Sequence, residues 1–390
     1  MSAAYVLAAV RTPGGKAKKG KLKHLRPDDL AAAAIRALLE RTGIDPRLVE
    51  DVLLGCAFPE AEAGMNVARV AALRAGLPVQ VPGQTVNRFC ASGLQTIATA
   101  AERILAGAAD CLVAGGTESM SLIPMGGNKY SANPALAAAW PESYAAMGIT
   151  AELVAEQHRI SREDQDAFAA ESHRRAAAAQ AAGSFADELV PVEVETAAVV
   201  GGKLRKEKEV LSADEGVRAD TTAAALAALA PAFKLGGTVT AGNASQMTDG
   251  AAAALVVSEA FLARTGLRPL GRFVSYAVSG VPPELMGIGP VEAIPAALRR
   301  AGVARDQLAA VELNEAFAAQ ALACARALEL DPARVNPNGG AIALGHPLGC
   351  TGAKLTATLL GELRRSGGRY GVVSMCVGGG MGAAAVFERC

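Results

Sequence analysis

The sequence lacks any uninterrupted run of about 18 apolar residues, the length that a membrane-spanning helix needs. The apolar stretch at residues 3–10 is short and ends at Arg11-Thr-Pro, which favours a buried strand over a secretory or membrane segment. The sequence also lacks an excess of one charge, because 38 Lys and Arg balance 38 Asp and Glu. A nucleic-acid partner is therefore not expected, although a local basic patch for a phosphate group is still possible.

The common cysteine motifs are absent too. No two of the seven cysteines form a C-x-x-C pair, and their number is odd. This pattern favours reduced thiols in the cytoplasm over a disulfide framework or a metal site. Buried cysteines are often inert core residues, so each functional cysteine has to be argued from its own surroundings.

The sequence does contain abundant apolar surface in a regular alternation of strand-like and helical segments. With 390 residues, of which 51% are hydrophobic, the chain is expected to form two or three packed units. The alternation predicts an α/β fold with a parallel or mixed sheet covered by helices. The first helix is expected to begin with Asp28 or Asp29 as its N-cap and to end at Gly43. Strands are predicted at 5–10, 51–55, 111–114, 310–313 and 370–375, and helices at 28–42, 91–106, 291–301 and 352–365.

The two ends of the chain resemble each other at a fixed offset. A helix, a glycine turn, a strand and a small-residue turn before a second helix recur in the same order. This shared register indicates a duplication, although chance agreement is possible in a chain so rich in alanine and leucine. About four further residues would then bring Gly115-Gly116 onto Gly378-Gly379. The matching residues are Ile35, Leu39, Arg41, Gly43, Val52 and Ser92-Gly93 in the first half, and Ile294, Leu298, Arg300, Gly302, Val311 and Thr351-Gly352 in the second.

A region of different character, at about 119–250, separates the two halves. It begins with an expected irregular loop at 120–144, and it continues with a helical stretch at 151–182 in which Ser161 caps a second helix. The mixed charges at 203–209 are typical of a solvated surface loop. An insertion between repeated halves is well placed to cover a site and hold a substrate.

Cys90 follows a tight turn and directly precedes a predicted helix, in NRFCASG at 87–93. At a helix N-terminus a thiol faces unpaired backbone N–H groups and the positive end of the macrodipole. Both favour the thiolate, which is the nucleophilic form. A buried structural cysteine in a strand-to-helix turn is the alternative.

His346, one of only four histidines, lies in the glycine-rich stretch NGGAIALGHPLGCTG at 338–352. By the repeat, this loop is the counterpart of the Cys90 turn. Glycine permits a close backbone approach to a ligand, and Pro347 restricts the turn. A histidine with a purely structural role in the core is the alternative.

Cys376 ends a predicted strand and precedes a run of glycines, in MCVGGGMG at 375–382. The run lacks the Lys-Ser/Thr ending of a P-loop and the acidic residue of a dinucleotide site. A turn that presents backbone N–H groups to an oxyanion is the better interpretation.

Asn314 follows another predicted strand, in NEAF at 314–317. The strand would present its amide at the same edge as the Cys90 and His346 loops. Taken alone, the motif favours a plain turn or a helix cap over a functional role.

Together, NRFCASG, NEAF, GHPLGCTG and MCVGGGMG, in this order, resemble the thiolase family. TAGNAS at 240–245 and MGITAE at 147–152 also match its loop region, and the resemblance extends from Arg11-Thr-Pro to Phe387-Glu. It implies two similar α/β halves stacked in five layers, αβαβα, with an inserted loop domain. The expected units are an N-terminal half at 1–118, completed by about 245–268, a loop domain that binds coenzyme A (CoA) at 119–244, and a C-terminal half at 269–390.

The resemblance also implies the chemistry. Cys90 would attack the ketone of a 3-ketoacyl-CoA and carry the shortened acyl chain until free CoA takes it. His346 would activate Cys90, and Cys376 would act as acid and then as base. Backbone N–H groups of Cys90 and Gly378 would bind the oxyanion of the acyl-enzyme. His346 and a water held by Asn314 would bind the thioester oxygen of the leaving acetyl-CoA.

For CoA, a co-substrate and not a permanently bound cofactor, the resemblance implies a set of binding positions. Arg218 would lie near the nucleotide and Ser245 would bind the pantetheine amide. The full set is Arg218, Phe233, Ala241, Ser245, Met147, Ala316 and Phe317. Short-chain biosynthetic members carry a histidine where this chain has Ala146, so that contact with CoA phosphate is not carried over.

Several features resemble the degradative 3-ketoacyl-CoA thiolases of fatty-acid β-oxidation more than the biosynthetic acetoacetyl-CoA enzymes. They are Gln246, Leu344 and Ser374, together with AVFE at 385–388. The family implies a homodimer or a dimer of dimers, and the cytoplasm is the expected compartment.

Two other functions compete with thiolysis. A decarboxylating ketoacyl synthase shares the fold, but it lacks a second catalytic cysteine such as Cys376. A catalytically silent lipid- or CoA-binding protein would not need every catalytic position to be filled.

Overall fold

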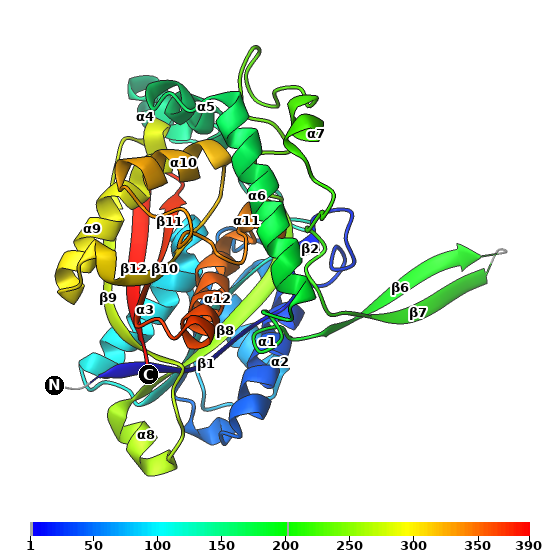
Figure 1. Cartoon of the computed structure of the whole chain (residues 1–390). Coiled ribbons are helices and arrows are strands. Elements are labelled where there is room, and N and C mark those ends of the chain that lie inside the picture. The colour runs from blue at the N-terminus through cyan, green and yellow to red at the C-terminus, as the bar shows by residue number, and fades with distance from the viewer. Residues whose placement is uncertain (1–2, 201–202) are drawn as a thin grey trace.

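The structure, a computed structural model, describes residues 3–200 and 203–390, and it places their side chains except at 196–200 and 203–205. Ten strands form one long mixed sheet (Figure 1). They are β1 (Ala4–Arg11), β2 (Gly15–Lys16), β3 (Asp51–Gly55), β4 (Gly83–Val86), β5 (Cys111–Glu118), β8 (Thr248–Ser258), β9 (Gly271–Gly280), β10 (Leu308–Leu313), β11 (Tyr370–Val377) and β12 (Met381–Arg389). Their order is β10-β11-β12-β9-β1-β8-β5-β3-β4, with β2 paired to β8.

The sheet consists of two halves with the same pairing pattern. In the first half β3 and β5 are parallel, and β5, β8 and β1 are antiparallel; β10, β11, β12 and β9 repeat this pattern in the second. Ala4, Tyr5 and Val6 of β1 pair with β9 and join the halves edge to edge. The counterpart of β4 is reduced to one parallel bridge between Val311 and Val335. The predicted duplication is confirmed, with the two halves hydrogen-bonded into a single sheet.

The strand register corrects the predicted alignment of the glycines. Asp51 pairs with Leu112 in the first half, and Ala310 pairs with Gly371 in the second. One offset of 259 residues (310 minus 51, and 371 minus 112) therefore relates both pairs, and the four extra residues are not needed. The expectation was wrong because it matched glycines by identity, whereas hydrogen bonding sets the register. At this offset Thr117 is the counterpart of Cys376.

Helices cover both outer faces of the sheet halves and also fill the space between them. Helices α3 and α12 pack on each other and on strands of both halves, α1 and α2 cover the first half, and α9 covers the second. This arrangement is the expected αβαβα stack. The helices of the two halves are α1 (Pro27–Thr42), α2 (Val67–Ala75), α3 (Ser92–Leu105), α8 (Glu259–Thr265), α9 (Gly289–Ala301), α10 (Ala318–Ala327), α11 (Ala341–Leu344) and α12 (Thr351–Ser366).

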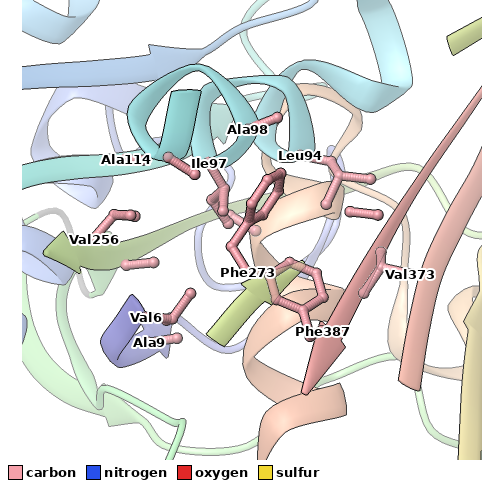
Figure 2. Packing of buried hydrophobic residues seen from close by; sticks show 14 of the residues in the cluster. Val6, Ala9, Leu94, Ile97, Ala98, Ala114, Val256, Phe273, Val373 and Phe387 are labelled. Atoms are coloured by element: carbon pink, nitrogen blue, oxygen red, sulfur yellow. The ribbon is translucent and has the colours of Figure 1, made fainter. Parts of the chain in front are cut away.

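The central core lies where α3 meets both sheet halves (Figure 2). Apolar residues of α3 recur at helical spacing, so Leu94 and Ile97 project from one buried stripe. They lie near Phe273 of β9 and Phe387 of β12, whose rings meet edge to face at 5.9 Å. The two halves therefore share one core, and the turns that begin α3 and α12 rest on a rigid base.

The segment between β5 and β8 forms the insertion. Its elements are α4 (Pro134–Ala139), α5 (Met147–Gln157), α6 (Arg162–Ala181), β6 (Val192–Val200), β7 (Lys203–Leu211) and α7 (Ala223–Ala227). Helix α4 interrupts the loop expected at 120–144. Ser161 caps α6 as predicted, since its hydroxyl accepts from the Asp164 backbone N–H at 3.0 Å. In Figure 1 the β6–β7 hairpin projects away from the body of the molecule.

Two local predictions were wrong. Helix α1 begins at Pro27 with Arg26 as its N-cap, and Asp28 and Asp29 lie in its first turn, because proline already has the φ of a first helical residue. The solvated loop expected at 203–209 is strand β7. Lys206 and Lys208 are exposed, but they also pair across the hairpin, as Lys206 does with Glu195 at 2.6 Å.

Candidate active site

The turn that carries Cys90 is a short 3₁₀ segment, Phe89–Ala91, immediately before α3. Phe89 has a φ of 43°, an unfavourable value for a bulky side chain. Two side chains hold this conformation. The Phe89 N–H donates to Asn87 Oδ1 at 2.8 Å, and the Ser92 hydroxyl donates to the Phe89 carbonyl at 2.6 Å. Cys90 is thereby fixed in a nearly buried position at the start of the helix.

The His346 turn meets the Cys90 turn where α3 and α12 cross. A Cβ on Gly93 would press on the backbone of Ala353 at 2.9 Å, and one on Gly352 would clash with the backbone of Leu94. Both helix starts therefore need glycine for their close approach. A second 3₁₀ segment, Leu348–Cys350, precedes α12 just as Phe89–Ala91 precedes α3. The two turns that the repeat relates are thus neighbours.

The hydrogen bonds of His346 define the state of its ring. Nε2 lies 3.3 Å from the Asn314 amide nitrogen, and Nδ1 lies 2.6 Å from the Thr351 hydroxyl. That hydroxyl donates to the Pro347 carbonyl at 2.9 Å, so its oxygen accepts from Nδ1–H. This network assigns the proton to Nδ1 and the lone pair to Nε2. Burial, and then the charge of Lys354, lower the pKa of His346 to about 3, so the ring is neutral.

The thiols are also neutral, contrary to the expectation that the helix start would favour a thiolate at Cys90. Burial raises the pKa of Cys90 to about 12, and the backbone N–H groups of Gly378 and of Cys90 itself oppose this shift only in part. Burial, and then the neighbouring Cys90, raise the pKa of Cys376 well above its usual value. Desolvation exceeds the helix-terminus effect because both cysteines are almost fully buried.

One cavity of about 650 Å³ connects most of the residues singled out in the sequence. Those that line it are Cys90, His346, Cys376, Met147, Arg218, Phe233, Ala241, Ser245, Ala316 and Phe317. Asn314 and Gly378 do not line it but adjoin residues that do: Asn314 contacts His346, and the Gly378 N–H lies by Cys90. The rings of Phe233 and Phe317 meet edge to face at 6.0 Å.

Three positioning residues were missed in the sequence. Thr351 holds Nδ1 of His346, and Lys354 donates to the carbonyls of Leu344 and Gly345 at 2.7 and 2.9 Å. The buried carboxylate of Glu118 accepts from the N–H groups of Gly349 at 2.7 Å and Ala57 at 2.8 Å, and so ties the two halves together. Thr351 and Lys354 follow His346 closely in sequence, which was the available signal. Nothing near Glu118 marked it.

The cavity wall also contains residues that the sequence did not single out. Among them are Lys16 of β2, Ala17 and Lys19 of the loop that follows it, and the methionines Met120, Met125, Met247 and Met286. Methionine is flexible and adapts to apolar ligands of varied shape. The wall is therefore mainly apolar and deformable, with its cations confined to a few positions.

All seven cysteines are unpaired. Within residues 3–200 and 203–390, no three His, Cys, Asp or Glu side chains are arranged to hold a metal ion. In the same ranges, no helix has the length and apolar character needed to cross a membrane.

Comparison with known proteins gives matches along the whole chain. The thiolase N-terminal domain matches residues 4–260, and the thiolase C-terminal domain matches residues 267–389. The 3-ketoacyl-CoA thiolase of Bacillus subtilis (strain 168) is 55% identical, with 100% of both chains covered. The peroxisomal 3-ketoacyl-CoA thiolase A of Mus musculus is 49% identical over 97% of this chain and 89% of its own.

Solved structures agree with these matches. Human mitochondrial 3-ketoacyl-CoA thiolase superimposes with a TM-score of 0.90 at 41% identity, covering 100% of this chain and 99% of its own. The acetyl-CoA acetyltransferase of Bacillus anthracis superimposes equally well, with the same identity and coverage. On this evidence the chain belongs to the thiolase family.

Proposed function

We propose that the chain cleaves 3-ketoacyl-CoA by thiolysis, with Cys90 as the nucleophile. The Cys90 sulfur adds to the ketone carbon, the bond between the α and β carbons breaks, and acetyl-CoA leaves. CoA then attacks the acyl-Cys90 thioester and releases an acyl-CoA shortened by two carbons. The observation that carries this proposal is the meeting of two thiols and one imidazole in a single cavity.

Protons move between neutral groups in this scheme. Because Cys90 and His346 are both neutral, the Cys90 proton passes to Nε2 of His346 as the sulfur attacks. Cys376 protonates the departing carbon, and its thiolate then accepts the proton of the incoming CoA thiol. Each thiol regains its proton by the end of the cycle.

Two groups of donors support the oxyanions. The N–H groups of Cys90 and Gly378 would bind the oxygen on the ketone carbon, where one such donor is typically worth about 3–4 kcal/mol. The enolate oxygen of acetyl-CoA would bind to His346 and to a water held by Asn314. Asn314 suits that role because its buried Oδ1 has no hydrogen-bond partner among the described residues.

The remaining predicted residues form a channel for CoA, with the segment 119–244 as the CoA-binding unit. Met147, Phe233 and Phe317 supply apolar walls for the pantetheine arm, together with Ala241 and Ala316. Ser245 would bond a pantetheine amide, and Arg218 would lie at the nucleotide. The exposed position of Arg218 at the cavity rim supports this direction of entry.

The substrate class that we favour is the 3-ketoacyl-CoA of fatty-acid β-oxidation, in the cytoplasm. A methionine-rich wall suits acyl chains of varied length, and the relatives' names agree with it. A short-chain acetyl-CoA acetyltransferase is the second candidate, favoured by the equal match to a solved enzyme of that name. Thiolysis rates from acetoacetyl-CoA to 3-ketohexadecanoyl-CoA separate them, because activity on acetoacetyl-CoA alone would refute the degradative role.

A homodimer, alone or paired, is the expected assembly. Strand β4 is an edge strand of the long sheet, and such edges are normally covered. Large apolar side chains are exposed around it, among them Met65 at 95% and Val79 at 71%. Sedimentation of the purified chain tests this, and a monomer at micromolar concentration would contradict it.

A further inference from the structure

The cavity that contains the two thiols has charged residues at one end only. Lys16, Lys19 and Arg218 line it, whereas no aspartate or glutamate does within the described parts of the chain. Lys19 and Arg218 are exposed and Lys16 is half-buried, while Cys90 and Cys376 are almost fully buried. The cations therefore surround the mouth of the cavity, and the reacting groups lie at its closed end.

The two lysines come from a different segment than Arg218, and Glu215 holds these segments together. Its carboxylate accepts from the backbone N–H groups of Lys16 at 3.0 Å and Lys21 at 3.1 Å. A side chain on Gly20 would clash with the same carboxylate, so the loop wraps closely around it. We call residues 16–21 the lysine loop. Since Glu215 is three residues before Arg218, this loop lies beside the Arg218 segment.

His173 gives an independent sign that Lys16 and Arg218 are close. Its Nδ1 accepts from the Arg218 backbone N–H at 3.2 Å. Burial is the main cause that lowers the pKa of His173 to about 4, and the charges of Arg218 and then Lys16 lower it further, against Asp220. Both cations therefore act on one buried ring and contribute to one local positive field.

The three cations at the mouth lack carboxylate partners. Among the described residues, neither Lys16, Lys19 nor Arg218 forms an ion pair, whereas Lys21 of the same loop pairs with Glu209 at 2.5 Å. Unpaired like charges around an apolar cavity repel one another, and an anionic ligand relieves that repulsion. Phosphate is a suitable ligand, because lysine binds it as a strong point-charge donor.

We propose that Lys16 and Lys19 act with Arg218 to bind the 3′-phosphate and diphosphate of CoA at the mouth of the cavity. This inference rests on the proposed use of CoA by the chain, and it assigns part of the nucleotide site to the N-terminal half. The apolar wall between the mouth and Cys90 suits the uncharged pantetheine arm. CoA thus enters thiol first, with its phosphates retained outside at the three cations.

Thiolysis measured with three acceptor thiols, CoA, dephospho-CoA and pantetheine, tests the proposal. The variants K16Q and K19Q, alone and combined, are compared with K18Q, an exposed neighbour that does not line the cavity. The combined variant is expected to raise the KM for CoA by about 10-fold, with kcat unchanged. The KM for dephospho-CoA should rise less, and that for pantetheine should not change. Added salt should weaken CoA binding more in the unmodified protein than in the combined variant.

Three results would overturn this assignment. One is an equal rise in KM for CoA, dephospho-CoA and pantetheine in the combined variant. Another is a rise in the KM for CoA in K18Q as large as that in the combined variant. The third is a loss confined to 3-ketoacyl substrates with a terminal carboxylate, which would assign the lysines to the acyl chain. Calorimetric titration measures the affinity for CoA alone. It therefore tests the phosphate contact even if the chain fails to cleave 3-ketoacyl-CoA.

Discussion

Among single residues, Cys90 and His346 line the same cavity as neutral, almost fully buried groups. A neutral thiol of such low acidity needs a base at the moment of attack. Charge separation between them would be costly before substrate arrives. Attack on the ketone coupled to proton transfer avoids a free thiolate. In the proposed mechanism, the N–H groups of Gly378 and Cys90 would then stabilise the negative charge that develops.

The first prediction concerns pH. With the pKa of His346 lowered to about 3 and that of Cys90 raised to about 12, mainly by burial, neither group titrates near neutrality. The rate of Cys90 acylation by acetoacetyl-CoA, followed by intact mass, should therefore be flat between about pH 5 and 7. An acidic limb near pH 6.5, the ordinary histidine value, would contradict this.

Deprotonation of Lys354 should cause a decline in the acylation rate at alkaline pH. Burial lowers its pKa to about 8, so raising the pH through that value removes the charge that holds the Leu344 and Gly345 carbonyls. Acylation should slow above it. K354M should be slower at pH 7 and should lack the alkaline limb; a limb that persists in K354M would assign it to another group.

A second prediction concerns Thr351. Without its hydroxyl, Nδ1–H of His346 loses its acceptor, and Nε2 is no longer held as the proton-accepting nitrogen. T351V should lower kcat by about 10- to 100-fold with little change in KM, and T351S should restore it. Unchanged turnover in T351V would show that the tautomer does not depend on this contact.

At the scale of elements, the crossing of α3 and α12 brings the two reactive turns together. G352A would force a Cβ into the Leu94 backbone, so unfolding free energy should fall by about 1–3 kcal/mol and activity should fall with it. G361A on the same helix is the control, because its Cβ would meet only side-chain atoms, the flexible end of Arg365 at 3.2 Å and Glu188 Oε2 at an ordinary contact distance of 3.8 Å. Similar denaturant midpoints for the two variants would contradict the account.

Sequence patterns predicted most helices and strands and most residues around the cavity. They did not predict properties that depend on tertiary packing. The repeat indicated that the Cys90 and His346 turns are equivalent, because the same kind of small residues begins a helix after each turn. The protonation of Cys90 was mispredicted because its burial comes from elements far away in sequence. A binding role for Lys16 and Lys19 could not be predicted from the sequence, because only the folded structure places them at the rim of the cavity.

At the scale of the whole molecule, a buried ion cluster attaches the insertion to the sheet. Arg11 of β1 binds Glu188 at 2.6 Å and Asp214 at 2.7 Å, and all three side chains are buried. These contacts join segments nearly 200 residues apart and hold the insertion against the two halves. The cavity lies where these parts meet.

Removing one member of this cluster should be costly. R11M leaves two buried carboxylates without their cation and should lower the free energy of unfolding by about 3–5 kcal/mol. R47M breaks the exposed Arg47–Asp45 pair and should leave the denaturation midpoint almost unchanged. Chemical denaturation of both variants checks the difference, and equal midpoints would show that the cluster does not support the fold.

The most direct test of the account is the site of the acyl intermediate. The chain is incubated with acetoacetyl-CoA without free CoA, quenched, digested and mapped by peptide mass. We expect the acetyl group on Cys90, and none in Cys90→Ala, which should also lose thiolysis. An acetyl group on Cys376, or thiolysis retained in Cys90→Ala, would contradict it.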